Sequence, residues 1–117
     1  MSKFTWRLDQ PAAGLVRLVL SGEMSLSERA PMRQAFDALI AAEGPDQAID
    51  FSLVRMVSSA AIGELARCHH QIASLGRKSL LICPPGDVLE ILEVADMHRL
   101  ISLYPDLPTL VAERALS

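Results

Sequence analysis

Aromatic side chains and surplus positive charge are both scarce in this sequence. Only 4% of the 117 residues are aromatic, with one Trp and one Tyr, so the stacking platform that single-strand nucleic-acid binders use is missing. The formal net charge is -3, which leaves no excess of Lys and Arg to neutralise a phosphate backbone. The composition therefore argues against a direct nucleic-acid partner.

Long apolar runs are missing as well. No uninterrupted stretch approaches the roughly 20 residues that a transmembrane helix needs, and residues 1–9 carry charges where a signal peptide needs an apolar segment. Two cysteines, Cys68 and Cys83, have no CxxC spacing, which is typical of reduced, partly buried thiols. We expect a cytoplasmic protein without a membrane span.

Signatures of catalysis and of cofactor binding are also lacking. The sequence has no GxSxG, GxGxxG or Walker A motif. Cys68-His69-His70 does not form a metal site by itself, because consecutive helical residues point about 100° apart. His69 falls on an apolar helix face, where one satisfied ring nitrogen is expected, and Asp50 is expected at the surface or in a cap. We expect no catalysis, no cofactor and no metal.

The chain does contain enough apolar residues for one core. Half of its residues are hydrophobic and 21% are charged, which is typical of a compact globular domain. Its length is that of one domain, and it has no linker, internal repeat or low-complexity tract. We therefore expect a single domain over residues 1–117.

Apolar periodicity and turn residues predict the order of the elements. Residues 4–8 and 15–20 predict a hairpin, and a helix follows that ends at Gly44-Pro45. Its start is open between residues 27 and 31, because Ser25 and Glu28 have capping-box spacing while Pro31 cannot donate a helical hydrogen bond. Three strand-then-helix pairs come next, at 47–51 and 59–75, at 79–83 and from Asp87, and at 100–104 and 106–115. This alternation predicts an α/β fold with a mixed sheet and right-handed crossovers.

Three segments resemble one known family in their order and spacing. Residues 20–24 read LSGEM, residues 49–54 read IDFSLV, and residues 76–107 contain LLI, RL and YPDL. Together they are similar to the STAS domain family of anti-sigma-factor antagonists, and the match covers nearly the whole chain. The resemblance implies a mixed sheet of four or five strands with helices packed mainly on one face.

The same resemblance implies a function. Bacterial members commonly bind an anti-sigma factor that is also a serine protein kinase, and phosphorylation of a loop serine abolishes that binding. By this resemblance the chain is a regulatory protein-interaction module in partner switching, with a serine phosphatase as a possible further partner. The alternative is a constitutive, unphosphorylated STAS scaffold or small-ligand sensor subunit in a larger complex.

The resemblance places the phosphorylation loop at residues 57–60. The family reads Asp-Ser-Ser-Gly there, and this chain has Val57-Ser58-Ser59-Ala60. Ser58 corresponds to the phosphate acceptor, with Ser59 as second choice. Val57 and Ala60 depart from the family pattern, and this departure favours the constitutive alternative. A serine at this position also has a purely structural interpretation, as the N-cap of the following helix.

A partner-binding surface is expected around this loop. Its expected members are Met56, Val57, Ser58, Ser59 and Ala60. Four apolar residues lie around the loop, namely Leu53, Val54, Met56 and Val57. Apolar residues of this kind suit the docking of a partner helix when they are exposed. We expect Val57 to be exposed, whereas Val54 and Met56 fit either exposure or a place in the core.

Overall fold

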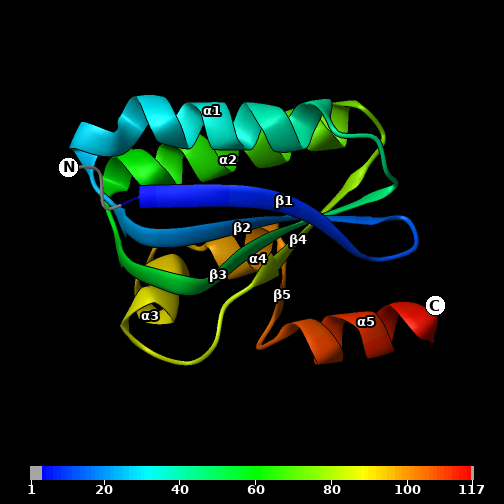
Figure 1. Ribbon diagram of the computed structural model, residues 1–117. Coiled ribbons are helices and arrows are strands. Elements are labelled where there is room, and N and C mark those ends of the chain that lie inside the picture. The colour runs from blue at the N-terminus through cyan, green and yellow to red at the C-terminus, as the bar shows by residue number, and fades with distance from the viewer. Residues whose placement is uncertain (1–3, 117) are drawn as a thin grey trace.

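The computed structural model describes residues 4–116 and contains a five-stranded mixed sheet in the order β1-β2-β3-β4-β5 (Figure 1). The strands are β1 (Phe4–Ala12), β2 (Leu15–Met24), β3 (Asp46–Val57), β4 (Lys78–Ile82) and β5 (Ser102–Tyr104). β1 pairs antiparallel with β2, and the other neighbours are parallel. The predicted α/β fold is thus confirmed. Residues 1–3 and 117 of the expected 1–117 domain lie outside the described residues.

The helices lie mainly on one face of the sheet, as predicted. They are α1 (Arg29–Ala41), which follows the 3-10 turn η1 (Leu26–Glu28), α2 (Ser59–Ser74), α3 (Asp87–Val94), α4 (Met97–Leu100) and α5 (Leu107–Ala115). Figure 1 shows α1 and α2 side by side above the sheet and α5 on its opposite side. Right-handed crossovers between parallel neighbours in one direction bring α1 to α4 to the same face.

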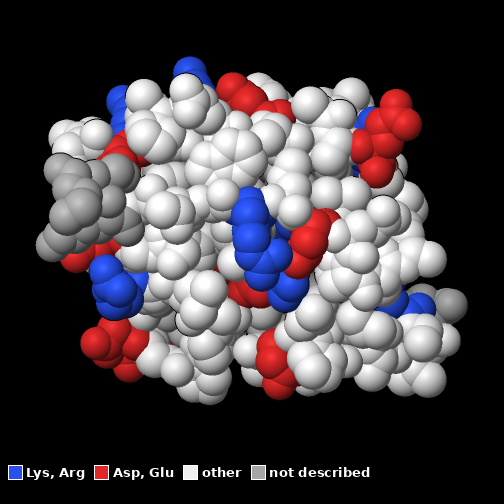
Figure 2. Space-filling view, viewed as in Figure 1, with Lys and Arg blue, Asp and Glu red and all other residues white. Residues whose placement is uncertain are grey.

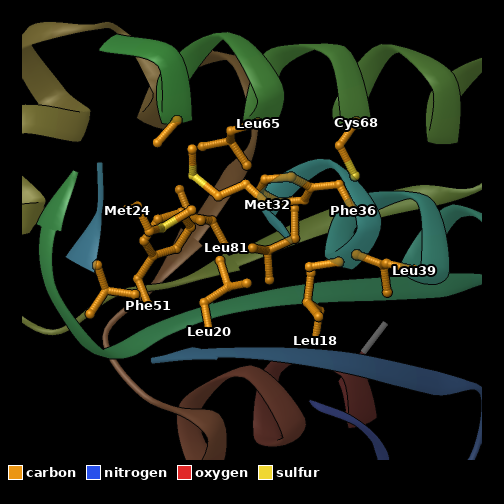
Figure 3. Packing of buried hydrophobic residues seen from close by; sticks show 14 of the residues in the cluster. Leu18, Leu20, Met24, Met32, Phe36, Leu39, Phe51, Leu65, Cys68 and Leu81 are labelled. Carbon is orange, nitrogen blue, oxygen red and sulfur yellow. The ribbon is translucent and has the colours of Figure 1, made fainter. Parts of the chain in front are cut away.

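The main core fills the space between the sheet and this helical layer. In Figure 3, Leu20, Phe51 and Leu81 of the sheet point toward Phe36 of α1 and Leu65 of α2. All five are almost fully buried, and burying one such side chain contributes about 1.5–3 kcal/mol. This shared core holds α1 and α2 against the sheet, and so it also places the first residues of both helices relative to the strands.

A smaller apolar cluster lies on the other face, beneath α5. It comprises Leu15, Ala48, Leu80, Ile82, Tyr104 and Leu110. Asp106 caps α5 by accepting the Thr109 N–H at 2.8 Å, and Arg114 near its end binds Asp46 at 2.8 Å. The Arg114–Asp46 pair thus joins the C-terminal end of α5 to the first residue of β3.

The third strand extends well beyond the predicted residues 47–51. It runs to Val57 because β2 supplies partners as far as the pair Met24–Val57. The ladder is irregular between Val19 and Ser21 and again between Gly22 and Glu23. These shifts break the alternation of buried and exposed side chains, so the strand pattern is lost after Phe51 although the pairing continues.

Several helix ends also differ from the prediction. Ser25 and Glu28 form no capping box, since Ser25 Oγ lies 2.9 Å from Ser27 Oγ and does not cap η1. α3 begins at Asp87, as predicted, and its N-cap is Gly86. The short helix α4 was not predicted. The predicted stop of α2 is confirmed, because Gly76 adopts φ +73° and donates its N–H to Ala73 O.

Candidate functional site

Ser58 lies where β3 ends and α2 begins. Its backbone is extended, its N–H donates to Met24 O at 3.0 Å, and its carbonyl accepts from the Ile62 N–H at 3.1 Å. Its Oγ accepts from the Ala61 N–H at 3.2 Å. Ser58 is therefore the N-cap of α2, which is the structural interpretation given above, and such a cap contributes about 1 kcal/mol.

The two serines of this loop differ in exposure. Ser58 and Ala60 are half-buried, whereas Ser59 is exposed. The cap bond occupies one lone pair of Ser58 Oγ, so its hydroxyl proton is still free to be donated. The first amides of a helix carry a partial positive charge. An added phosphate on this turn would therefore be electrostatically compatible with the helix.

The expectation that Val57 is exposed is wrong. Val57 belongs to the main core with 6% of its surface exposed, and Val54 is buried at 7%. The shifts in the ladder with β2 turn every third residue inward here, so Phe51, Val54 and Val57 face the helices. Val57 thus packs in the core directly before the loop and offers no surface to a partner.

Three apolar side chains close to this end of the sheet are exposed. Leu26 of η1 is 66% exposed, Leu53 is 56% exposed and Met56 is 37% exposed. Met56 pairs in register with Glu23, and the Met24 carbonyl accepts the Ser58 N–H. Because η1 begins two residues after Met24, Leu26 lies at the same edge of the sheet. We call Leu26, Met56, Ser58 and Ser59 the Ser58 surface. Leu26 was missed, although an apolar residue between two turn serines was its visible signal.

A buried carboxylate joins the two helices that begin at this edge. Glu64 of α2, with a side chain only 3% exposed, binds Arg33 at 2.9 Å, Arg67 at 3.0 Å and Arg29 at 3.6 Å. The hydrogen bond from Arg33 chiefly lowers the pKa of Glu64, against the opposing effect of burial. This network, which the sequence did not reveal, holds the starts of α1 and α2 together.

A second ionic network crosses the opposite face of the sheet. Arg17 binds Asp9 at 2.7 Å and Asp50 at 3.1 Å, and Arg7 also binds Asp9. In Figure 2, positive and negative side chains meet over the middle of β1 and β2. Asp50 is buried, so the expected surface position is wrong, although its Oδ1 does cap the N–H of Ser52 at 2.9 Å.

The remaining candidate residues have structural positions. Cys68 and Cys83 are buried and unpaired, as expected, and burial raises their pKa values to about 12 and about 11. His69 Nδ1 is hydrogen-bonded to Ser79 Oγ, so the prediction of one satisfied nitrogen is confirmed. Within residues 4–116, no three His, Cys, Asp or Glu side chains converge in a way that suits a metal ion. No helix in this range has the length and apolar character to cross a membrane.

Known proteins share the motif order and the mixed sheet of this chain. Residues 9–105 match the family model described as Mlab, STAS domain. The chain belongs to the STAS domain family. The resemblance based on its motifs is thus confirmed over most of its length. No curated protein has a sequence that matches this chain significantly.

Solved STAS structures share the fold at low sequence identity. An anti-sigma factor antagonist from Mycobacterium paratuberculosis is 19% identical with a TM-score of 0.84, over 94% of this chain and 92% of that one. The phosphorylated form of SpoIIAA, a Bacillus cell fate determinant, is 12% identical with a TM-score of 0.67, over 95% and 99% of the two chains.

A STAS domain inside a much larger protein is similar too. The murine anion transporter Solute Carrier 26 family member A9 is 16% identical with a TM-score of 0.78. The match covers 92% of this chain and 19% of the transporter. The STAS fold therefore occurs both in small antagonists and as one part of a transporter.

Proposed function

We propose that this STAS domain is a regulatory protein-interaction module of the anti-sigma-factor-antagonist type. It binds an anti-sigma factor that is also a serine kinase through the Ser58 surface, and phosphorylation of Ser58 ends the binding. The supporting observation is that Ser58 caps α2 at 3.2 Å from the Ala61 amide, beside the exposed Leu26 and Met56. The proposal puts this exchange in the cytoplasm, with a serine phosphatase restoring the binding form.

The surface has the composition of a small docking site. Leu26 and the exposed part of Met56 offer apolar area to a partner, and such residues form the centre of many protein interfaces. Ser58 and Ser59 add hydroxyl groups that can donate to a partner. The Glu64 network and the main core keep this edge rigid, so little entropy is lost when the partner docks.

Phosphorylation would act on binding and not on the fold. A phosphoserine adds about -1.5 to -2 charges, which suit the helix N-terminus on which Ser58 lies. Burying that charge under an apolar partner surface would cost several kcal/mol. A loss of about 4 kcal/mol turns a micromolar complex into a millimolar one. The domain would remain folded while its partner dissociates.

Ser59 is the competing phosphate acceptor. It is exposed, whereas Ser58 is half-buried and uses its Oγ in the cap. A kinase that extends the loop would reach either hydroxyl. The two sites are distinguished by Ser58→Ala, which leaves Ser59 in place, and by Ser59→Ala, which leaves the cap intact.

A second candidate is a constitutive scaffold or sensor subunit in a larger complex. The observation in its favour is Val57, which replaces the family aspartate and lies buried in the core. An apolar, inaccessible residue there gives a kinase no charge beside the acceptor serine. The transporter with an internal STAS domain is consistent with such a use of the fold.

One experiment compares the two candidates directly. The protein is purified from its native cells under several growth conditions, and its intact mass and phosphopeptides are measured. We expect a phosphate on Ser58, and we expect Ser58→Glu to lose a partner that Ser58→Ala retains. Ser74→Ala is the matched control, because Ser74 is exposed at the far end of α2. An unmodified mass throughout, with equal partner recovery by both Ser58 variants, would favour the scaffold.

A further inference from the structure

The outer side of β1 is an open edge of the sheet. β1 is the first strand in the sheet order and pairs only with β2 among residues 4–116. Its outer side therefore carries backbone N–H and C=O groups that have no ladder partner. β1 has nine residues, whereas β5, the strand at the other edge, has three. An open edge of this length can pair with a further strand.

Two apolar side chains of β1 are exposed beside this edge. Trp6 is 36% exposed and Leu8 is 37% exposed, and neither belongs to the main core. Trp6 pairs with Leu20, and Leu8 pairs with Leu18. Because residues directly opposite each other in an antiparallel pair point to the same face, Trp6 and Leu8 lie on the face that carries α1 and α2.

The flank of α1 above this edge is uncharged. α1 packs over β1 and β2, and α2 packs over β3 and β4, so the flank of α1 that points away from α2 faces the β1 edge. Arg33 and Asp37 of α1 bind side chains of α2. At about 100° per residue, the opposite flank holds Pro31, Gln34 and Ala38. Figure 2 shows uncharged residues between the charged group over β1 and the helix α1 above it.

The other face of β1 carries two opposite charges. Arg7 pairs with Val19 and Asp9 pairs with Arg17, so the side chains of Arg7 and Asp9 point away from α1 and α2. Arg7 binds Asp9 at 2.7 Å, and Asp9 also accepts two hydrogen bonds from Arg17. These ion pairs are complete within one chain. The two charges therefore do not require a partner, but they restrict which strand can lie beside β1.

A second copy of β1 meets this restriction in one register. Two-fold symmetry between antiparallel copies of one strand places the central residue opposite itself. With Arg7 or Asp9 at the centre, two like charges face each other, which is unfavourable. With Trp6 at the centre, Arg7 faces the uncharged Thr5. With Leu8 at the centre, Leu8 faces Leu8, and each Arg7 faces Asp9 of the second copy.

We propose that β1 pairs with β1 of a second copy of this chain, with Leu8 at the two-fold axis, and joins the two sheets into one. The ladder runs from Trp6 to Gln10 and ends there, because Pro11 has no N–H to donate. The exposed apolar area of β1 is covered between the two α1 helices. Ser58 follows β3, which β2 separates from β1, so the dimer carries two Ser58 surfaces. Its formation does not depend on phosphorylation of Ser58.

Sedimentation equilibrium between micromolar and millimolar concentration tests the association. We expect the average mass to rise from 12.7 kDa toward twice that value. Trp6 is the only tryptophan, so its fluorescence should shift to shorter wavelength over the same range as the second copy covers it. Leu8→Lys places two positive charges at the axis and should leave a folded monomer by circular dichroism. Leu75→Lys is the matched control, because Leu75 is 53% exposed at the end of α2, and it should dimerise like the parent protein.

Disulfide cross-linking tests the register. In Leu8→Cys the two new thiols lie opposite each other, with Cα atoms about 4.5–5.5 Å apart, which allows a disulfide. In the control Gln10→Cys, also at an exposed position of β1, they are four residues apart along the ladder, about 13 Å. Under mild oxidation we expect Leu8→Cys to cross-link at least about tenfold faster.

Three results would overturn the proposal. The first is a parent protein that stays monomeric at millimolar concentration. The second is equal dimerisation of Leu8→Lys and Leu75→Lys, which would place any contact between copies away from β1. The third is equally fast cross-linking of Gln10→Cys and Leu8→Cys, which would indicate random collision and not the two-fold ladder.

Discussion

Arg33 of α1 and Glu64 of α2 are joined by two hydrogen bonds, from Nε to Oε1 at 3.2 Å and from Nη2 to Oε2 at 2.9 Å. Arg67 adds a third bond to Oε1 at 3.0 Å. These bonds connect two helices that start at the edge of the sheet carrying Ser58. The position of α1 relative to α2, at the edge that carries Ser58, therefore depends on a carboxylate that is almost inaccessible to solvent.

Replacing this carboxylate tests its structural contribution. Glu64→Gln keeps the shape of the side chain but removes the charge that the arginines share. Because Arg33 and Arg29 are half exposed and water screens them, we expect a loss of only about 1 kcal/mol. Urea denaturation measures it through the midpoint. Glu90→Gln, at an exposed position in the first turn of α3, is the control and should lower the midpoint less than Glu64→Gln does.

The same carboxylate gives a pH dependence with a defined sign. Its folded-state pKa lies below the ordinary value of 4.5, so its contribution to stability is fully present above pH 4.5. That contribution is lost as the pH falls through the lowered folded-state pKa. The stability difference between the parent protein and Glu64→Gln should therefore shrink on acidification below pH 4.5. A difference that grows in that range would contradict the assignment.

Loss of the Ser58 cap should lower stability independently of any partner. Ser58→Ala leaves the Ala61 amide without its acceptor, and we expect a loss of about 1 kcal/mol. Thermal unfolding followed by circular dichroism measures it. Asp106→Ala removes the corresponding cap of α5 and is the control for partner binding. It should destabilise the domain while leaving capture by the Ser58 surface intact.

The exposed apolar residues should matter for binding more than for folding. Leu26→Ser removes a side chain that is 66% exposed, so stability should change little, whereas Met56→Ser removes one that is 37% exposed and should cost about 1 kcal/mol. Once a partner has been identified, each change should weaken its affinity about tenfold. Val94→Ser is the matched control, because Val94 is 87% exposed on α3. Equal weakening by all three would place the interface elsewhere.

The buried thiols should resist modification. Burial raises the pKa of Cys68 to about 12 and that of Cys83 to about 11, and only the thiolate attacks a disulfide reagent. In the native protein at neutral pH we expect almost no reaction, and in urea we expect two thiols to react. The absorbance of the coloured thiolate released from the disulfide reagent measures the reaction in both conditions. Fast modification of the native protein would mean that a cysteine is accessible.

Elements governed by local chemistry could be predicted from the sequence. The hairpin of β1 and β2 has turn residues between two apolar runs, and α2 has Ser58 at its start and Gly76 at its end. Capping and turn preferences act within a few residues, so they can be recognised without the fold. The family motifs extended this prediction to the whole sheet.

Tertiary pairing decided what local patterns could not show. Val57 looked like an exposed residue of a loop, but irregular pairing with β2 extended the strand and turned it into the core. Glu64 looked like an ordinary helical glutamate until α1 brought Arg33 against it. In both cases the neighbour that sets the environment is about 30 residues away.

The family, the order of the elements and the place of Ser58 at a helix start can all be inferred from the sequence, because these depend on residues close together in the chain. The packing of the folded chain sets which side chains near Ser58 are exposed and brings Arg33 against Glu64. Burial and convergence are properties of strands and helices packed together, and chain positions far apart set them.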